Sequence, residues 1–288
     1  MILIADSGST KTAWCLAGFS AGQGTTIHTQ GINPYHQNEE DICAILRHEL
    51  YPHIAEHADD IKHIYFYGAG CTKEKSPIVS NALRNTINPN ARISVESDML
   101  GAARAICGHQ KGIVCILGTG SNSCYYDGHE LSRGIPALGY ILGDEGSGAY
   151  IGRRLVSDIL KCQLPEDIRQ VFFEETKENE ATIIQKVYRA PFPNRYLASL
   201  SPFCCRHRNH PSIHALLLEC FSQFFIRNIL PTPWAQPHSP ITVHLAGSIA
   251  HYYKAELTEA AHKCGIQLGV VLKSPLAELL RYHTENTQ

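Results

Sequence analysis

LIADSGSTKTAW, residues 3–14, places a short apolar run and one aspartate before a cluster of small polar residues, after which the apolar pattern resumes. This pattern predicts a strand, a tight turn and a returning strand. Gly8 can take a positive φ and turn neighbouring N–H groups into a concave nest, to which serine and threonine hydroxyls add donors. The segment is therefore either a plain hairpin turn or a loop that holds a phosphate group.

Five residues of this loop are candidate phosphate contacts: Ser7, Gly8, Ser9, Thr10 and Lys11. Asp6 stands at the end of the first strand, where its carboxylate would hold Mg²⁺ through water, because this cation gives up its hydration shell reluctantly. The chain contains no GxxxxGK[ST] and completes no GxGxxG, so a nucleotide would be bound without these two signatures.

Strand-like and helix-like segments alternate outward from this hairpin, which is typical of an α/β protein. In the first part of the chain we expect strands at 2–6, 12–18, 25–31, 63–68 and 92–97, and helices at 38–57 and about 76–87. A second strand, glycine-rich turn and strand begin at residue 112, with a further strand after Gly128. The two halves of the chain therefore start alike, which suggests a duplicated fold.

The remaining pattern predicts mostly helices and one pair of strands. Helices are expected at about 147–161, at 165–188 in pieces, at about 195–229 with interruptions, at 248–264 and at 274–283, and strands at 241–247 and 266–272, with a loop at 230–240. Ser274 is the expected N-cap of the last helix and Pro275 its first residue. We expect two lobes, residues 1–108 and 109–288, with the last helix, about 274–284, packing back on the first lobe.

Composition narrows the class of protein. A chain of 288 residues with 44% apolar residues, 18% charged residues and a net charge of -2 can bury a large core and shows no basic surface for nucleic acid or membranes. The eleven cysteines include no CxxC pair, so we expect buried reduced thiols and no dedicated metal centre. The short apolar run before Asp6 predicts no secretory leader, and the expected location is the cytoplasm.

LGTGSNS, residues 117–123, repeats the chemistry of the first loop. Gly118, Thr119, Gly120 and Ser121 are candidate phosphate contacts, and Asn122 adds a polar group. Alone, this segment is equally well explained as a turn. Two such loops at the starts of two similar lobes favour phosphate binding, because facing loops would hold a polyphosphate between them.

Four further positions carry polar groups where α/β proteins bind ligands, and each has a structural alternative. Asp144, before a helix, would bind sugar hydroxyls or a metal-bound water beside free helix N–H groups, or be an acidic N-cap. Asp98, between a strand and a helix, is a candidate catalytic residue or an N-cap. Asn33 would bind a hydroxyl or form an Asn-Pro turn. The strand, Gly247-Ser248 and helix would approach a base or ribose, or be an ordinary connection.

Together these motifs resemble those of the fold shared by actin, sugar kinases and chaperone ATPases, and most closely the N-acetylglucosamine kinases of the BadF/BadG/BcrA/BcrD ATPase group. The resemblance covers nearly the whole chain and rests, in chain order, on DSGSTKT, GINPY, SDMLGAARA, LGTGSNS, GYILGDEGSG and LAGSIA. It implies a two-lobed α/β fold, actin-like and ribonuclease H-like, in which each lobe has a mixed sheet flanked by helices and the active site lies in the interlobe cleft.

The resemblance also implies an activity. The chain would be an ATP-dependent kinase, with Mg²⁺, that phosphorylates the 6-hydroxyl of an amino sugar, and relatives of this kind are commonly homodimers. Asp98 would accept the hydroxyl proton as catalytic base. Adenosine would lie against Gly247, Ser248 and Ile249, and the sugar would contact Asn33, Asp98, Asn122, Gly139 and Asp144.

Three departures from the family pattern bear on the substrate. Ser7 and Ser9 stand where glycine is common, Ala13 stands where an acid is common, and Ala137-Leu138-Gly139 replaces a common Gly-Trp-Gly. N-acetylglucosamine is the expected sugar, with N-acetylmuramic acid and glucosamine as alternatives. An ATPase that activates 2-hydroxyacyl-CoA dehydratases through a shared iron-sulfur cluster ranks lower, because Cys71 and Cys124 belong to no cysteine cluster.

Overall fold

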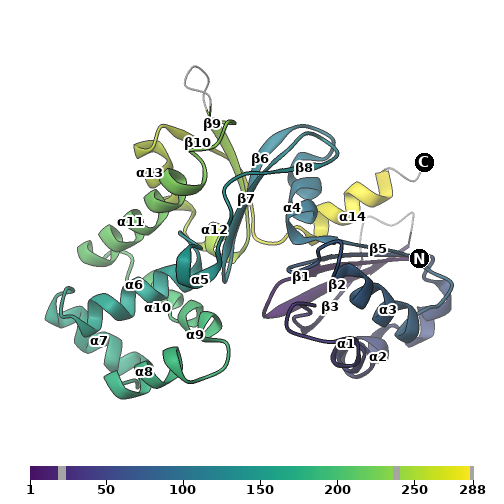
Figure 1. Ribbon diagram of the computed structural model, residues 1–288, viewed down its shortest axis with the longest axis horizontal. Coiled ribbons are helices and arrows are strands. Elements are labelled where there is room, and N and C mark those ends of the chain that lie inside the picture. The colour runs from purple at the N-terminus through teal and green to yellow at the C-terminus, as the bar shows by residue number, and fades with distance from the viewer. Residues whose placement is uncertain (19–23, 236–240, 286–288) are drawn as a thin grey trace. The chain divides into compact units, whose positions relative to one another are not determined.

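The computed structural model describes residues 1–18, 24–235 and 241–285 (Figure 1). The chain divides into two compact units. Unit 1 comprises Met1–Gly112, Tyr126–Leu131 and the C-terminal segment from Ser274, and unit 2 comprises Ile113–Tyr125 and Ser132–Lys273. The last part of the expected loop at 230–240 lies outside the described residues.

Unit 1 is built on a five-stranded mixed sheet in the order β3-β2-β1-β4-β5. The strands are β1 (Ile2–Ser7), β2 (Lys11–Ala17), β3 (Thr25–Gln30), β4 (His63–Gly68) and β5 (Arg92–Ser97). β1, β2 and β3 are antiparallel, whereas β1, β4 and β5 run parallel. The carboxyl ends of β1, β4 and β5 therefore meet at one edge, which is where parallel sheets place ligand-binding groups.

Helices cover both faces of this sheet. One face carries α1 (Glu39–Ile45), a π-helix (Leu46–Leu50), α2 (Tyr51–Ile54), a 3₁₀ helix (Ala55–Asp60) and α3 (Ser76–Thr86), and the other carries α4 (Asp98–Cys107) and α14 (Leu276–Glu285) (Figure 1). The expected single helix at 38–57 is wrong. Pro52 lacks the N–H that an α-helix needs, and in the turn before it the Tyr51 N–H bonds the Leu46 carbonyl instead.

Unit 2 repeats the strand arrangement, in the order β10-β9-β6-β7-β8. The strands are β6 (Gly112–Leu117), β7 (Ser121–Tyr126), β8 (Leu131–Arg133), β9 (Ile241–Ala246) and β10 (Ile266–Leu272). β9 lies parallel to both β6 and β10. In each unit a meander of three consecutive strands is followed by two added strands, so the duplication expected from the sequence is confirmed.

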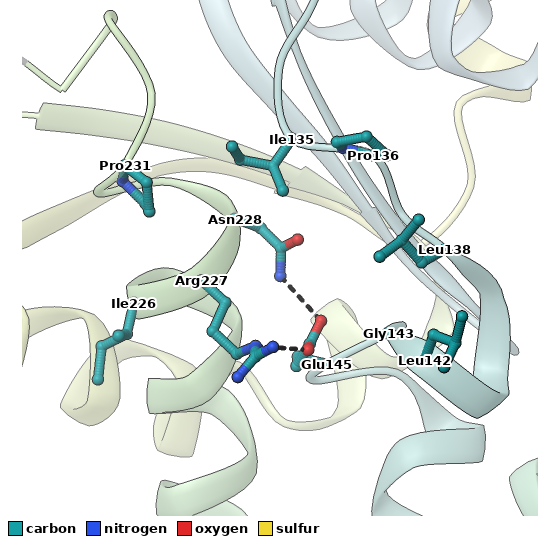
Figure 2. Close-up of a pocket in the computed structure, with 10 residues that line it drawn as sticks. All are labelled: Ile135, Pro136, Leu138, Leu142, Gly143, Glu145, Ile226, Arg227, Asn228 and Pro231. Atoms are coloured by element: carbon teal, nitrogen blue, oxygen red, sulfur yellow. Dashed lines mark hydrogen bonds and ion pairs between the residues drawn. The ribbon is translucent and has the colours of Figure 1, made fainter.

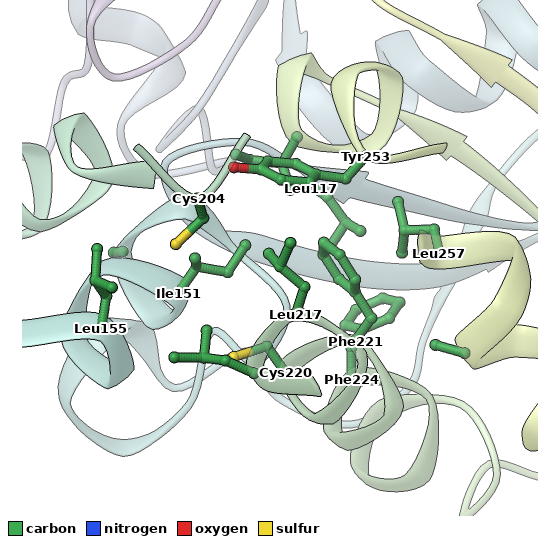
Figure 3. Packing of buried hydrophobic residues seen from close by; sticks show 14 of the residues in the cluster. Leu117, Ile151, Leu155, Cys204, Leu217, Cys220, Phe221, Phe224, Tyr253 and Leu257 are labelled. Atoms are coloured by element: carbon green, nitrogen blue, oxygen red, sulfur yellow. The ribbon is translucent and has the colours of Figure 1, made fainter. Parts of the chain in front are cut away.

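The helices of unit 2 are α5 (Gly139–Leu142), α6 (Gly148–Leu160), α7 (Glu166–Thr176), α8 (Glu180–Tyr188), α9 (Pro193–Ser199), α10 (Ser201–Arg206), α11 (Pro211–Asn228), α12 (Ser248–Tyr252) and α13 (Lys254–Lys263). The expected helix at 248–264 is two helices, divided at Tyr253. The Tyr253 ring is buried in the core with Phe221 and Leu217, as Figure 3 shows. Among the described helices, none has both the length and the apolar character needed to cross a membrane.

Burial differs among the cysteines. All eleven are free thiols; Cys162 is exposed, and Cys107, Cys205 and Cys264 are partly exposed. The expectation of buried thiols is therefore confirmed for the other seven and wrong for Cys162. Cys162 follows the last turn of α6 with a positive φ, which places it at the surface of a helix end.

Candidate functional site

The first hairpin is fastened from inside by hydroxyl groups. The fully buried Ser7 hydroxyl lies 2.7 Å from the Thr12 hydroxyl, donates to the Ile32 carbonyl at 3.0 Å and accepts the Ile32 N–H at 3.1 Å. Thr12 is equally buried and donates to the Gln30 carbonyl. These bonds tie β1 and β2 to the segment after β3, so the Ser7 hydroxyl is engaged within the protein. A phosphate contact of Ser7 stays a prediction.

The tip of this hairpin is compact and exposed. The Gly8 N–H donates to the Lys11 carbonyl at 3.0 Å, and the Gly31 N–H donates to the Thr10 carbonyl at 3.1 Å. A Cβ at Gly31 would lie 2.6 Å from the Gly8 carbonyl oxygen, so glycine is required there for the close approach. Gly8, Thr10 and Lys11 are exposed and Ser9 is half-buried. This tip can therefore present its groups to a ligand.

Two carboxyl groups stand at the carboxyl edge of the unit 1 sheet. Asp6 is the penultimate residue of β1, and Asp98 is the first residue of α4, directly after β5. Ser97 caps α4, because its hydroxyl accepts the Leu100 N–H at 3.2 Å. Asp98 is therefore not the N-cap, which removes the structural alternative for this residue. Its Oδ1 accepts the adjacent Met99 N–H at 2.9 Å.

Both carboxyl groups are held closer to their neutral form than usual. Burial raises the pKa of Asp98 to about 6. Burial also raises the pKa of Asp6 to about 6, and the negative charge of Asp98 acts in the same direction. The Lys11 ammonium and a hydrogen bond from the Ser274 hydroxyl, at 3.3 Å, oppose this rise. Both carboxyl groups therefore have a pKa of about 6, and the charge of Asp98 contributes to that of Asp6.

Asn33 lies in the loop after β3 and forms a turn. Its Oδ1 accepts the Tyr35 N–H at 3.0 Å, and its own N–H donates to Gln37 at 2.7 Å. A Cβ at Gly70 would collide with Asn33 Oδ1, so the loop after β4 packs directly on this side chain. The turn alternative is thus realised for the carbonyl oxygen, while the amide Nδ2 is the group that a sugar hydroxyl could still meet. The sugar contact stays a prediction.

A carboxylate holds the second hairpin loop, between β6 and β7. Buried Asp144 accepts the Ser121 N–H at 3.3 Å, and a Cβ at Gly120 would lie 2.9 Å from Asp144 Oδ2. Burial raises the pKa of Asp144 to about 6, while the Ser121 N–H opposes the rise. Asp144 itself has a left-handed backbone (φ 56°), an uncommon conformation for a residue other than glycine. Asp144 therefore supports the loop that was expected to bind phosphate.

The N-terminus of α6 also holds this loop. The Gly148 N–H donates to the Gly118 carbonyl at 2.8 Å and the Ala149 N–H to the Thr119 carbonyl at 3.1 Å. Ser147 is the N-cap and accepts the Tyr150 N–H. The expectation of free N–H groups at this helix end, and the alternative of an acidic N-cap, are both wrong, because the loop carbonyls and Ser147 take those positions.

Glu145, next to Asp144, lies in a pocket of unit 2. Its carboxylate accepts Arg227 Nε at 2.8 Å and Asn228 Nδ2 at 3.2 Å (Figure 2). The pocket has a volume of about 290 Å³, and its other lining residues include Leu138, Leu142 and Ile226. No spacing in the sequence links Glu145 to α11.

Two further predicted sugar contacts of unit 2, Asn122 and Gly139, are exposed. Asn122 is exposed on β7, and its Oδ1 accepts the Ser123 N–H at 2.9 Å. Gly139 begins α5 with a positive φ, and no atom would meet a Cβ built there. Leu138, at the position of the family tryptophan, is 61% exposed and has a left-handed backbone. Roles for Asn122 and Gly139 in sugar binding stay predictions.

The predicted adenosine segment touches the second hairpin. Gly247 has a φ of 113°, and a Cβ there would collide with the Leu117 carbonyl, directly before Gly118. The Ile249 side chain is buried in the unit 2 core, so only its backbone could meet a ligand, whereas Ser248 is exposed. Unit 2 thus brings together residues 118–121, Asp144 and Gly247, and unit 1 brings together Asp6, Asp98 and the tip of the first hairpin.

The donor set of unit 1 suits a hard cation. Asp6 and Asp98 offer carboxylate oxygens, and Mg²⁺ is typically held by one or two carboxylates together with substrate phosphates and water. Among the described residues, no group of three or more His, Cys, Asp or Glu side chains is arranged as a metal cluster. Burial raises the pKa of the Cys71 thiol to about 12, so this thiol remains protonated.

Comparisons with known proteins identify relatives across the whole chain, although no family model matches the sequence. A solved structure from Porphyromonas gingivalis, a candidate N-acetylglucosamine kinase, is 46% identical and superimposes with a TM-score of 0.94 over 100% of both chains. A candidate N-acetylglucosamine kinase from Chromobacterium violaceum has a TM-score of 0.72 and 17% identity, over 98% of this chain and 99% of that chain.

Two further comparisons extend the likeness. A ROK family glucokinase from Streptomyces griseus, solved with glucose and AMPPNP, shares the fold at a TM-score of 0.55 and 14% identity, over 98% of this chain and 97% of that chain. The N-acetyl-D-glucosamine kinase of Dictyostelium discoideum is 27% identical over 171 residues, which are 55% of this chain and 53% of that protein, so the match spans about half of its length. With 46% identity to the P. gingivalis protein along its full length, the chain belongs to the BadF-type sugar kinase family.

Proposed function

We propose that this protein is an ATP-dependent kinase that transfers the γ-phosphoryl group of ATP to the 6-hydroxyl of an amino sugar, with N-acetylglucosamine as the preferred sugar. Two relatives, from P. gingivalis and D. discoideum, carry this sugar in their names. A neighbour of the same fold was solved with a sugar and an ATP analogue. In the reaction, the bond between the γ-phosphorus and its bridging oxygen breaks, and a new phosphorus–oxygen bond to the sugar forms.

The position and surroundings of Asp98 are the observation that carries this proposal. It lies at the carboxyl edge of the sheet, does not cap its helix, and titrates near neutral pH. Asp98 accepts the proton of the 6-hydroxyl as the oxygen attacks the phosphorus, and a base with a pKa near the working pH is the most effective for this step. Its half-buried position keeps the carboxylate away from bulk water.

Asp6 is the residue proposed to hold Mg²⁺ through a water molecule. A bound Mg²⁺ supplies positive charge that neutralises the phosphoryl oxygens. Lys11, exposed at the tip of the neighbouring hairpin, offers a further positive charge beside Asp6. The tip residues Ser9, Thr10 and Lys11 supply donors for phosphate oxygens, because the Gly8 N–H is already bonded to the Lys11 carbonyl. Catalysis of phosphoryl transfer depends mainly on positioning and charge.

Unit 2 supplies the second phosphate loop and the adenosine contact. Residues 118–121 bind phosphate oxygens, and Asp144 with the N-terminus of α6 keeps that loop in shape. Gly247 and Ser248 lie against the adenosine. For the sugar, Asn33 contributes its amide nitrogen, and Asn122, Gly139 and Asp144 are further proposed contacts.

The choice of sugar is tested by one substrate panel. Purified protein is incubated with ATP, Mg²⁺ and N-acetylglucosamine, N-acetylmuramic acid, glucosamine or glucose, and ADP formation is followed for each sugar. We expect the highest kcat/KM for N-acetylglucosamine. Leu138 in place of the family tryptophan makes N-acetylmuramic acid the informative competitor. ADP formation at the same rate without any sugar would contradict the proposal.

Location and assembly complete the proposed function. We propose that the protein works in the cytoplasm, where ATP is present, and that it forms a homodimer. Cell fractionation tests the location. Sedimentation velocity of the purified protein tests the dimer. Concentrations from about 1 to 50 µM detect a dimer whose Kd lies in that range.

A further inference from the structure

The C-terminal helix α14 binds the sheet of unit 1 through one apolar face. Leu276, Leu279 and Leu280 are buried, and their spacing of three and four residues places them on the same side of the helix. α14 packs against α4, β1 and β2. This helix therefore contacts both elements that carry the proposed acids, β1 with Asp6 and α4 with Asp98.

Aromatic and polar contacts fix the far end of α14. The His283 ring stacks on Tyr65 with 3.6 Å between ring centroids, and its Nε2 lies 2.8 Å from the Tyr67 hydroxyl. Arg104 of α4 donates to the same hydroxyl at 2.9 Å and lies 5.6 Å from the centre of the Tyr282 ring. With this end fixed, the helix cannot slide along the sheet, so its first residues are held in place as well.

The near end of α14 meets Asp6. The Ser274 hydroxyl donates to Asp6 Oδ2 at 3.3 Å and accepts the Leu276 N–H at 3.4 Å. One hydroxyl therefore joins the start of the helix to the carboxylate. The two residues lie 268 positions apart in the sequence, and the chain passes from unit 2 to unit 1 between Lys273 and Ser274.

We infer that Ser274 is a positioning residue that holds the Asp6 carboxylate in the orientation needed for phosphoryl transfer. The inference rests on the proposed function and deepens it. Because Ser274 donates to Oδ2, Oδ1 would keep both of its lone pairs for a metal-bound water. Lys11 and the charge of Asp98 also act on Asp6, but neither fixes the rotation of its carboxylate.

A pair of variants separates positioning from helix capping. Ser274→Thr keeps the hydroxyl, and Ser274→Gly removes it, while threonine and glycine cap helices about equally well. Thr284→Ala serves as the control, because the Thr284 hydroxyl bonds only carbonyls of its own helix, Leu280 and Arg281. Each variant is assayed for kcat and for the KM values of ATP and sugar. Binding of ADP is measured by calorimetry with and without Mg²⁺.

We expect Ser274→Gly to lower kcat about tenfold, the lower end for a lost hydrogen bond to a charged group, because this bond is exposed. Its KM for the sugar should stay unchanged, and Mg²⁺ should strengthen its ADP binding less than in the wild type. Ser274→Thr and Thr284→Ala should behave like the wild type. If Ser274→Gly and Ser274→Thr had equal kcat values and equal Mg²⁺ dependence of ADP binding, the inference on Ser274 would be overturned and the proposed function would stand. A wild-type protein without sugar-dependent ADP formation would overturn the proposed function as well.

Discussion

The two hairpin loops, residues 7–12 and residues 117–121, have the same strand setting but are held in opposite ways. In the first loop, the buried hydroxyls of Ser7 and Thr12 turn inward to the backbone around Ile32. In the second loop, the Ser121 N–H bonds Asp144, and the loop carbonyls accept the first N–H groups of α6. The serine at position 7, where glycine is common in relatives, is explained by this inward role.

This difference separates two uses of polar residues in similar loops. The Ser7 hydroxyl forms hydrogen bonds with buried backbone groups, so its removal would lower the free energy of unfolding. Asp144 places the backbone of the second loop, so its loss would alter ligand binding. Asp6, Asp98 and Asp144 all have a raised pKa. A raised pKa does not by itself distinguish a catalytic base from a residue that holds a loop in place. The contacts of each carboxylate make that distinction.

Asp98→Asn is expected to have the largest effect. Loss of the base should lower kcat by about 10²–10⁴-fold, with ADP affinity unchanged. Because the pKa of folded Asp98 lies above its ordinary value, the charged form disfavours folding at pH 8, so the variant should be at least as stable as the wild type. Steady-state kinetics, calorimetry with ADP and urea unfolding measure the three quantities. Near-normal kcat would remove Asp98 from the role of base.

The pH dependence tests the same carboxylate. Asp98 must be ionised to accept a proton, so kcat/KM should fall about tenfold per pH unit below a pKa of about 6 and level off above it. Asp6 titrates in the same range and is coupled to Asp98, so the acid limb reports the pair. Steady-state kinetics from about pH 4.5 to 8.5, at intervals small enough to define one titration curve, give the profile. A profile that stays flat down to about pH 5 would show that neither carboxyl group is perturbed during turnover.

Asp144→Ala is expected to weaken nucleotide binding. It leaves the Ser121 N–H without its acceptor, which costs about 1–3 kcal/mol. If this cost falls wholly on nucleotide binding, the ADP affinity decreases by about 5- to 150-fold. Calorimetry with ADP measures the affinity, and kinetics give the KM of the sugar. If only the sugar KM rises, Asp144 is a sugar contact and does not support the second loop. Asp127→Asn, in an exposed turn of unit 1, is the matched control.

Ser7→Ala should have the smallest effect on catalysis. It leaves the Ile32 N–H and carbonyl with fewer partners, so the free energy of unfolding should decrease by about 1–3 kcal/mol. The KM of ATP should change by less than about twofold, because the Ser7 hydroxyl is engaged with the backbone of Ile32. Chemical unfolding and steady-state kinetics on the same preparation test both. A large rise in the ATP KM without loss of stability would make Ser7 a phosphate contact.

The repeated strand arrangement could be predicted from the sequence because it depends on local patterns. The apolar runs of β1 and β2, and the turn residues Gly8 and Gly120, are visible within a few positions. The π-helical turn before Pro52 was not predicted, because the apolar spacing of residues 38–57 continues across it. The hydrogen bonds between Asp144 and Ser121 and between Ser274 and Asp6 join residues far apart in the sequence, so no local spacing predicts them.

Identification of the product tests the proposed sugar kinase activity most directly. The protein is incubated with ATP, Mg²⁺ and N-acetylglucosamine, and the phosphorylated sugar is analysed by ³¹P and ¹³C NMR. The account predicts one ADP for each phosphorylated sugar, with phosphorus coupled to carbon 6. Two results would contradict the account: hydrolysis of ATP to free phosphate at a rate that does not depend on the sugar, or a phosphate group on another carbon of the sugar.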